Sequence, residues 1–192
     1  MKEKSTMKPI LFSTPMVQAI LEGRKTQTRR VVKPQPIKKG HFWTLDGAGW
    51  SSSSVVPVYG HSLYTRMPYK PGDILWVRET WYLETFYGAH SYVYRASEPN
   101  YPVNVGAGQH GWRPSIFMPK DVARIFLRVK EVRVEKVQDI TEEDTINEGV
   151  NNKEKFALLW DKLNKKRGYG WEANPWVWVI EFERIEKPEV TE

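Results

Sequence analysis

Residues 23–30, G-R-K-T-Q-T-R-R, hold four cationic side chains and two hydroxyls in eight positions. Lys25 and Thr28 are the pair of interest within this run. A threonine hydroxyl attacks an acyl group only when a nearby base removes its proton. A lysine amine becomes such a base only when its pKa is lowered. The run can therefore activate a nucleophile or hold an anion, and a solvated basic surface explains the same pattern equally well.

The elements around this run are expected to position its side chains. A short helix with its N-cap at Thr14 should end at Gly23, since glycine suits the left-handed residue that stops a helix. A strand follows, in which Thr28 and Arg30 share one face because side chains alternate along a strand. Lys25 precedes this strand in a turn, so its long side chain can reach that face.

A second group of interest lies in residues 74–82, I-L-W-V-R-E-T-W-Y, which have the composition of a single strand. Arg78 and Glu79 are unusual inside an apolar, aromatic strand, because charged side chains are rarely buried without partners. Two interpretations stay open. The strand is an edge with a solvated face, or it forms the polar wall of a pocket with Trp81 positioned to stack on a ring.

A third candidate is Glu148, near the end of a short predicted helix. Thr141 and the acids after it resemble a capping box, and Gly149 marks the end of the helix. A carboxylate at a helix C-terminus faces the negative pole of the helix macrodipole and is disfavoured there. A residue that opposes its local preference is a candidate for function.

Two stretches interrupt the pattern of strands and helices. Residues 33–70 contain four prolines and a glycine-rich tip, and we interpret them as a long irregular insertion. Trp43 and Trp50 should bury part of it against the rest of the protein. A second insertion, residues 84–118, is expected to hold one strand and a glycine-rich loop around 106–111.

The segment 123–137 predicts a long strand with a defect in it. Its apolar side chains change face at Lys130 and Glu131: Ile125, Leu127 and Val129 come before, and Val132 and Val134 follow. Such a slip of one residue indicates a bulge, which lets a small sheet curl into a barrel.

The formal charge of +6 is unevenly distributed along the chain. Residues 1–40 hold ten Lys or Arg and two Glu, a net +8, and the remainder therefore sums to −2. This asymmetry favours an anionic partner, with nucleic acid or a nucleotide as the leading candidate.

Other classes of protein are disfavoured by the composition. The absence of cysteine excludes disulfides, thiol catalysis and cysteine-based zinc sites, and the four histidines lack the spacing of metal ligands. We therefore expect no metal and no cofactor. No apolar run approaches the roughly 20 residues of a membrane span, and no signal peptide is recognisable. We expect a cytoplasmic protein with no membrane association, and no protein partner can be identified.

With these residues in view, the chain resembles the ASCH-domain proteins of the PUA-like superfamily, in particular their larger phage and prophage members. The resemblance is carried by residues 23–29, 71–81 (P-G-D-I-L-W-V-R-E-T-W), 113–119 (R-P-S-I-F-M-P), 140–149 (I-T-E-E-D-T-I-N-E-G) and 176–182 (W-V-W-V-I-E-F). It implies an α+β fold, a PUA-like small mixed β-barrel flanked by short helices. Residues 1–192 would form a single domain with insertions at about 33–70 and 84–118.

The resemblance also implies an activity. The family includes small amidohydrolases that remove the acetyl group from N4-acetylcytidine, and their catalytic lysine, threonine and glutamate match Lys25, Thr28 and Glu148. In that assignment Thr28 is the nucleophile, Lys25 is the base, and Glu148 orients the lysine or passes a proton to the leaving amine. The residues assigned to binding of a nucleobase or phosphate are Arg24, Arg29, Arg30, Arg78, Glu79, Trp81 and Phe117.

Two other functions fit the same residues. PUA-like relatives bind RNA or modified nucleobases without catalysis, and Lys25 and Arg30 on phosphates with Glu148 on a base amino group would serve that purpose. Some ASCH proteins are ribonucleases, so a metal-independent ribonuclease is a third hypothesis.

Overall fold

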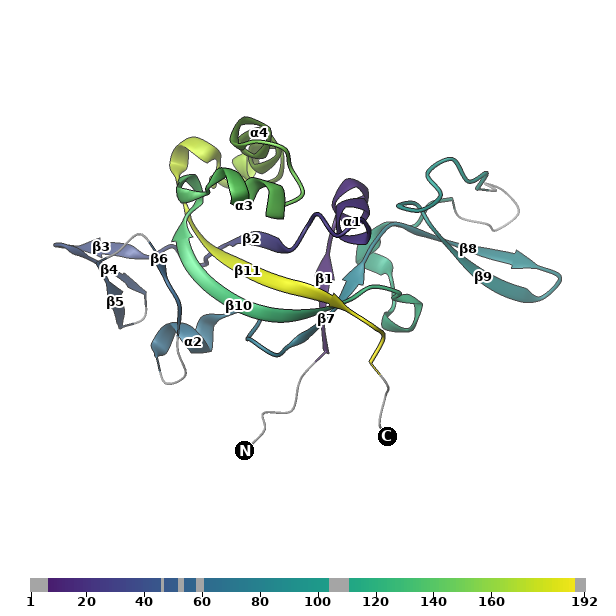
Figure 1. Cartoon of the computed structure of the whole chain (residues 1–192), viewed down its shortest axis with the longest axis horizontal. Helices are drawn as coiled ribbons and strands as arrows, with labels where there is room; N and C mark the ends of the chain where they lie inside the picture. Colours follow the sequence, from purple (N-terminus) through teal and green to yellow (C-terminus); the bar gives the residue numbers. More distant parts are fainter. Residues whose placement is uncertain (1–6, 46, 52–53, 58–60, 104–110, 189–192) are drawn as a thin grey trace. The chain divides into compact units, whose positions relative to one another are not determined.

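Short helices and a multi-stranded sheet make up the protein, as the computed structural model of residues 7–45, 47–51, 54–57, 61–103 and 111–188 shows (Figure 1). Parts of both predicted insertions lie outside these described residues, including most of the glycine-rich loop around 106–111. The described residues fall into two compact units. The first draws on Met1–Gly23, Asp73–Arg128 and Arg184–Glu192, and the second on Arg24–Gly72 and Val129–Glu183.

The first unit is built on β1 (Met7–Leu11), β7 (Ile74–Arg78) and the first residues of β10 (Phe126–Lys136). β1 runs parallel to β7, and β10 runs antiparallel to β7 with Phe126 opposite Trp76. β7 and the start of β10 are rich in β-branched and aromatic residues and bury Leu75, Trp76, Val77, Phe126 and Leu127, whereas β1 buries Ile10 alone of its five residues.

A hairpin of β8 (Trp81–Phe86) and β9 (Ala89–Tyr94) also belongs to the first unit (Figure 1). The unit further contains α1 (Thr14–Leu21) and two 3-10 turns, η1 (Ser115–Phe117) and η2 (Lys120–Val122). One of its apolar clusters consists of Trp76, Trp81, Met118, Val122, Ala123 and Phe126.

The second unit is built on β2 (Gln27–Val31), β11 (Trp176–Ile185) and the remainder of β10. β2 runs antiparallel to β11 with Thr28 opposite Ile180, and β11 is hydrogen-bonded to β10. β6 (Ser54–Val55) pairs with β10 as well.

Helices of the second unit pack on this sheet. Thr141 caps α3 (Glu142–Asn147) through the predicted capping box, here completed by Asp144. Phe156 and Trp160 of α4 (Lys153–Asn164) join a buried cluster with residues of β11. The shorter helical elements are α2 (Ser62–Arg66), η3 (Val137–Asp139), η4 (Lys165–Arg167) and η5 (Trp171–Ala173).

The predicted α+β class holds, since short helices accompany a multi-stranded sheet. The pairings of the described residues form no closed ring within either unit, so the barrel stays a prediction, as does the single domain with two insertions. The change of face in β10 agrees with its burial, because Leu127 and Val129 are buried before Lys130, and Val132 and Val134 are buried after it.

The prediction that residues 33–70 are irregular is wrong. The segment contains an antiparallel sheet of β3 (Ile37–Lys39), β4 (Phe42–Leu45) and β5 (Ala48–Trp50). The physical reason is aromatic packing: Trp43 and Trp50 meet the ring of Trp176 edge-on, with centroids 5.2 and 5.1 Å away. Trp50 is thus buried and Trp43 partly buried within the second unit, so the segment packs against the rest of the protein as expected.

The single strand predicted over residues 74–82 is also wrong. β7 ends at Arg78 and β8 starts at Trp81, because the second half pairs with Tyr94 and Arg113 rather than continuing beside β1. The N-cap of α1 is Ser13 rather than Thr14, a shift of one residue.

No helix in the described part of the chain is both long and apolar enough to span a membrane.

The packing of the small sheet can be tested by comparing two aromatic residues within it. Trp50 is 6% exposed and Phe42 is 55% exposed. We expect Trp50→Ala to lower the free energy of unfolding by roughly 3–5 kcal/mol, because it opens a cavity against Trp176. Phe42→Ala should change it by less than about 0.5 kcal/mol. Urea denaturation measures both, and equal losses would show that this sheet does not pack through Trp50.

Candidate functional site

Lys25 and Glu148 form a buried ion pair in the second unit, with 2% and 3% of their surfaces exposed. The Lys25 Nζ donates to Glu148 Oε2 at 2.9 Å, to the Glu148 carbonyl at 2.8 Å and to the Gln27 carbonyl at 2.7 Å. The ammonium therefore has an acceptor for each of its three protons. Two of the three residues assigned to catalysis are thus in direct contact.

The local sequence explains why this pair forms at the end of α3. Gly149 has φ +81°, the left-handed conformation that ends the helix, and Glu148 is its C-cap. The Thr26 backbone N–H donates to the Asn147 carbonyl at 2.8 Å, so the turn before β2 satisfies the exposed helix carbonyls together with Lys25. A cation at this pole also offsets the unfavourable position of the Glu148 carboxylate.

Arg29 extends the pair into a network. Its guanidinium, wholly buried, donates to Glu148 Oε1 at 3.1 Å, to Asp144 Oδ2 at 3.0 Å and to Glu135 Oε1. These carboxylates come from α3, its C-cap and β10, so one side chain of β2 connects the helix to the sheet. The Nε, Nη1 and Nη2 atoms of Arg29 are all engaged with carboxylates. That placement favours a structural role over the predicted phosphate contact.

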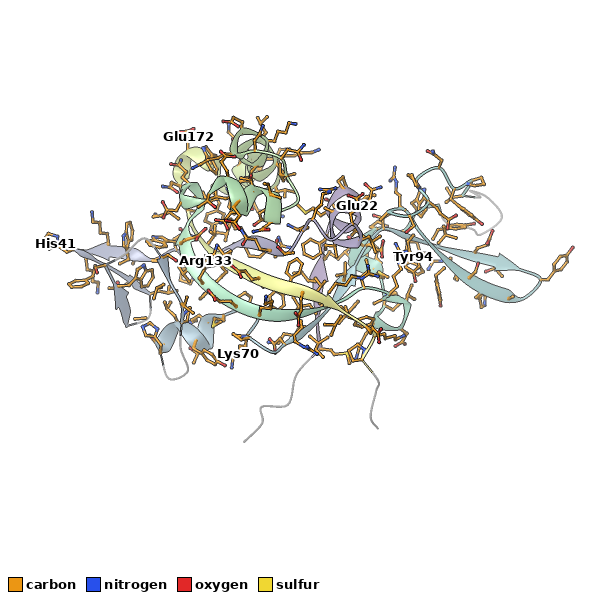
Figure 2. The ribbon with its side chains drawn as sticks, in the orientation of Figure 1. Glu22, His41, Lys70, Tyr94, Arg133 and Glu172 are labelled. Atoms are coloured by element: carbon orange, nitrogen blue, oxygen red, sulfur yellow. The ribbon has the colours of Figure 1, made fainter. Side chains whose placement is uncertain are left out.

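Arg133 of β10, labelled in Figure 2, belongs to the same network. It donates to Glu135 Oε2 at 3.0 Å, to Asp144 Oδ1 at 3.2 Å and to Glu181 of β11. With Arg30, which interacts electrostatically with Glu148, we define the charge cluster as Lys25, Arg29, Arg30, Arg133, Glu135, Asp144, Glu148 and Glu181. Four cations and four carboxylates give it a formal charge of zero.

Thr28 lies beside Arg30 on the same face of β2, as the alternation of the strand predicted. It is 1% exposed, and its Oγ1 accepts a hydrogen bond from Arg30 Nη1 at 3.1 Å. Arg30 is partly buried and also donates to the Arg29 carbonyl. The hydroxyl thus has a cationic donor next to it. Arg24, also assigned to phosphate binding, is exposed.

Burial sets the proton affinities in this cluster. It lowers the pKa of Lys25; the Glu148 carboxylate opposes this shift, and the charges of Arg30 and Arg29 add to it. Burial also lowers the pKa of Arg30, against the opposing effect of Glu148. For Asp144, burial acts to raise the pKa, but the hydrogen bond from Gln27 and the charge of Arg29 hold it below its ordinary value.

This arrangement can move a proton. Lys25, with its lowered pKa, gives up its charge more readily than an ordinary lysine and then offers a lone pair. Glu148 holds the amine in position and is itself held by Arg29. The dyad of Lys25 and Glu148 is therefore suited to acid–base chemistry.

The other predicted binding residues belong to the first unit. Arg78 donates to the Ile116 carbonyl and lies over the Trp76 ring at 5.4 Å. Glu79 is buried and accepts a bidentate pair of hydrogen bonds from Arg124, at 2.9 and 3.0 Å. Neither interpretation of the charged pair described this outcome, in which the buried Glu79 is paired with the partly exposed Arg124.

The aromatic candidates differ in exposure. Trp81 is 4% exposed, and the Arg113 guanidinium lies over its ring at 4.9 Å, where a stacking base was predicted. Phe117 is 71% exposed on η1. The pocket predicted between these residues, Lys25 and Glu148 stays a prediction.

Sequence reasoning missed half of the charge cluster: Arg133, Glu135, Asp144 and Glu181. Asp144 was interpreted only as part of a helix cap. Glu135 carried little signal, because side chains alternate along a strand and the position after Val134 faces the other side, where a solvated charge is ordinary. In the structure it is buried and needs a partner. The identity of that partner, Arg29, could not be read from the strand itself.

Within the part of the chain that the structure describes, no group of three or more His, Asp or Glu side chains is arranged to hold a metal ion.

No family model matches this chain, and no curated protein matches it. Among solved structures, the chain is similar to the crystal structure of protein EF3133 from Enterococcus faecalis V583, described as family-model DUF984. The TM-score is 0.47 at 8% identity, over 99% of this chain and 87% of that one. A likeness at this level assigns neither a family nor a function.

The structural role of Arg29 can be tested by removing its charge. We expect Arg29→Gln to lower the free energy of unfolding by about 3–5 kcal/mol, because it leaves buried carboxylates without their partner. Arg167→Gln, on the exposed turn η4, is the matched control and should cost less than about 0.5 kcal/mol. Urea denaturation followed by circular dichroism compares them. Equal stabilities would mean that the Arg29 ion pairs are not maintained in solution.

Proposed function

We propose that this protein is an amidohydrolase that removes the acyl group from an N-acylated pyrimidine nucleoside of the N4-acetylcytidine type, on an ASCH, PUA-like barrel. The observation that carries the proposal is the buried pair of Lys25 and Glu148, 2.9 Å apart. It lies in the same cluster as Arg30, which donates to the Thr28 hydroxyl at 3.1 Å. An amine, an alcohol and a carboxylate are the groups that acyl transfer needs.

In the first step, neutral Lys25 takes the proton of the Thr28 hydroxyl. Lys25 Nζ already contacts the carbonyl of Gln27, the residue directly before Thr28. A neutral amine keeps two of its hydrogen bonds and turns its lone pair to the hydroxyl. Glu148 holds the amine during the transfer and stabilises the ammonium that results.

Thr28 Oγ1 then forms a bond to the acyl carbon, and the carbonyl oxygen becomes an oxyanion. Arg30 is the donor closest to this reaction, since its Nη1 already contacts the attacking oxygen. The bond from the acyl carbon to the nucleoside nitrogen breaks, and the proton held by Lys25 passes to that nitrogen, directly or through Glu148. The products of this half-reaction are the free amine and an acyl ester of Thr28.

Water completes the reaction by the reverse proton path. Lys25 removes a proton from water, the hydroxide adds to the ester carbon, and the proton returns to Thr28 Oγ1 as the acid leaves. Within the second unit, Arg24 and Arg30 are assigned to charged groups of the nucleoside. These assignments come from the resemblance to ASCH proteins and complete the proposal.

A non-catalytic RNA-binding module is the second candidate function. It is favoured by the charge of residues 24–72, which contain nine Lys or Arg and one acidic residue. This excess of positive charge in one stretch of the sequence would attract a polyanion.

The nucleophile can be tested with two threonines of the same segment. Thr28 is buried beside Arg30, and Thr26 is exposed two residues earlier. On N4-acetylcytidine, we expect Thr28→Ala to lower kcat/KM by a factor on the order of 10³, and Thr26→Ala to leave it within about twofold. Release of cytidine, followed by chromatography, measures the rate. An unaltered rate in Thr28→Ala would rule out Thr28 as nucleophile, and no release by the unmutated protein would reject the hydrolase in favour of the binding module.

The base can be tested by the pH dependence of the same reaction. Because the pKa of Lys25 is lowered, the amine is neutral at a lower pH than in an ordinary lysine. We therefore expect kcat/KM to rise with pH through an apparent pKa below the ordinary lysine value. Lys25→Arg should abolish this rising limb, since arginine stays protonated, whereas Lys155→Arg, exposed on α4, should keep it. A rate that falls over this range would contradict Lys25 as the base.

A further inference from the structure

Three buried N–H groups of the first unit lack a hydrogen-bond acceptor: Arg78 Nε, Trp81 Nε1 and Arg113 Nε. They are among five buried side-chain atoms without a partner in the part of the chain that the structure describes. A buried donor without an acceptor costs about 1–3 kcal/mol. Native proteins contain few such groups, so three within one unit require an explanation.

The three donors are connected through one segment. Arg113 and Trp81 exchange backbone hydrogen bonds of 2.7 and 3.2 Å, and the Arg113 guanidinium lies over the Trp81 ring at 4.9 Å. Arg78 donates through Nη2 to the carbonyl of Ile116, three residues after Arg113. Arg78 and Trp81 therefore both contact the segment 113–116, to which Arg113 belongs.

Arg124, in the same unit, is an arginine whose charge is compensated by a carboxylate. Tyr94, labelled in Figure 2, is paired opposite Trp81 in the register of the hairpin, and Arg124 lies over the Tyr94 ring at 4.0 Å. Arg124 makes its bidentate ion pair with Glu79 and a further hydrogen bond to Ser97. Among the described residues, Arg78 and Arg113 have no such carboxylate. They bring positive charge and free donors to one segment without compensation.

We propose that Arg78, Arg113 and the Trp81 indole N–H bind a phosphate group carried by a nucleotide. A neutral acceptor could satisfy one N–H, but only an oxyanion also compensates two guanidinium charges, and its several oxygens suit the planar fork of arginine. Arg113 covers the indole, so the phosphate draws this guanidinium from the ring as it binds.

The apolar surface beside these donors extends the argument from phosphate to nucleotide. Ile116 and Phe117 on η1 are 57% and 71% exposed and follow Arg113 by three and four residues. An exposed ring next to an anion site suits a ligand with both a charged group and a flat base. The inference does not rest on hydrolysis in the second unit.

The test compares nucleotides with their nucleosides by titration calorimetry, using CMP against cytidine and AMP against adenosine. We expect each nucleotide to bind at least tenfold more tightly than its nucleoside. Arg113→Gln should remove this difference. Arg95→Gln is the matched control, an exposed arginine of the same unit that lies over Trp112 and has no orphaned donor among the described atoms; it should keep the difference.

A second variant distinguishes loss of the binding site from loss of the fold. Trp81→Phe keeps a ring beneath Arg113 and removes the N–H, so it should weaken CMP roughly fivefold and leave cytidine unaffected. Thermal unfolding shows that each variant is folded. Equal affinities for CMP and cytidine, or equal losses in Arg113→Gln and Arg95→Gln, would overturn the proposal.

A short oligocytidine identifies the source of the phosphate. Tighter binding than CMP, with an affinity that falls steeply as salt is added, assigns the site to a polynucleotide backbone. Binding no tighter than CMP assigns it to a free nucleotide. None of these ligands carries an acyl group, so failure of this proposal and failure of the hydrolase are separate results.

Discussion

The buried ion pairs of Arg29 and Lys25 with Glu148 are the constraint on which the second unit depends. Removing charges from water costs several kcal/mol per ion unless each one finds a partner with good geometry. Here the partners come from β2, β10, β11 and the end of α3, so the charges are compensated only when all four elements are in place. A buried charge cluster of this kind contributes less to stability than an apolar core of similar volume. It disfavours other arrangements of the sheet, because these would leave buried charges without partners.

The same cluster would carry the proposed chemistry, and this joins stability to function. Arg29 and Arg133 are enclosed by carboxylates, which suits them to holding the others in position. Lys25 and Glu148 form the end of the network next to Arg30, where a cation contacts a hydroxyl rather than an acid. A proton transfer from Lys25 changes its ion pair with Glu148, while Arg29 stays paired with the same carboxylate and with Glu135 and Asp144. The part of the network that holds the fold and the part proposed to react therefore share Glu148.

In the first unit, several arginines are positioned by aromatic rings. Arg78, Arg95, Arg113 and Arg124 each lie over an aromatic ring. Stacking on a ring positions a guanidinium without neutralising it, in contrast to the carboxylates of the second unit. The high aromatic content of the chain is thus used for more than the core. It holds cationic groups in place while leaving their charge available, except where Glu79 compensates Arg124.

Features that depend on neighbours a few residues apart were determined by the sequence alone. The Thr141 cap, the end of α3 at Glu148 and Gly149, and the shared face of Thr28 and Arg30 all follow from local periodicity and capping preferences. The unfavourable position of Glu148 also identified it as a residue of interest. Local pattern could not assign its partner, since Lys25 lies 123 residues away in the chain; the resemblance to ASCH proteins suggested the pair, and the tertiary structure brings the two side chains into contact. Likewise, the break between Arg78 and Trp81 and the sheet within residues 33–70 were decided by which strand each segment met, and pairing across the chain leaves little trace in the pattern of either strand.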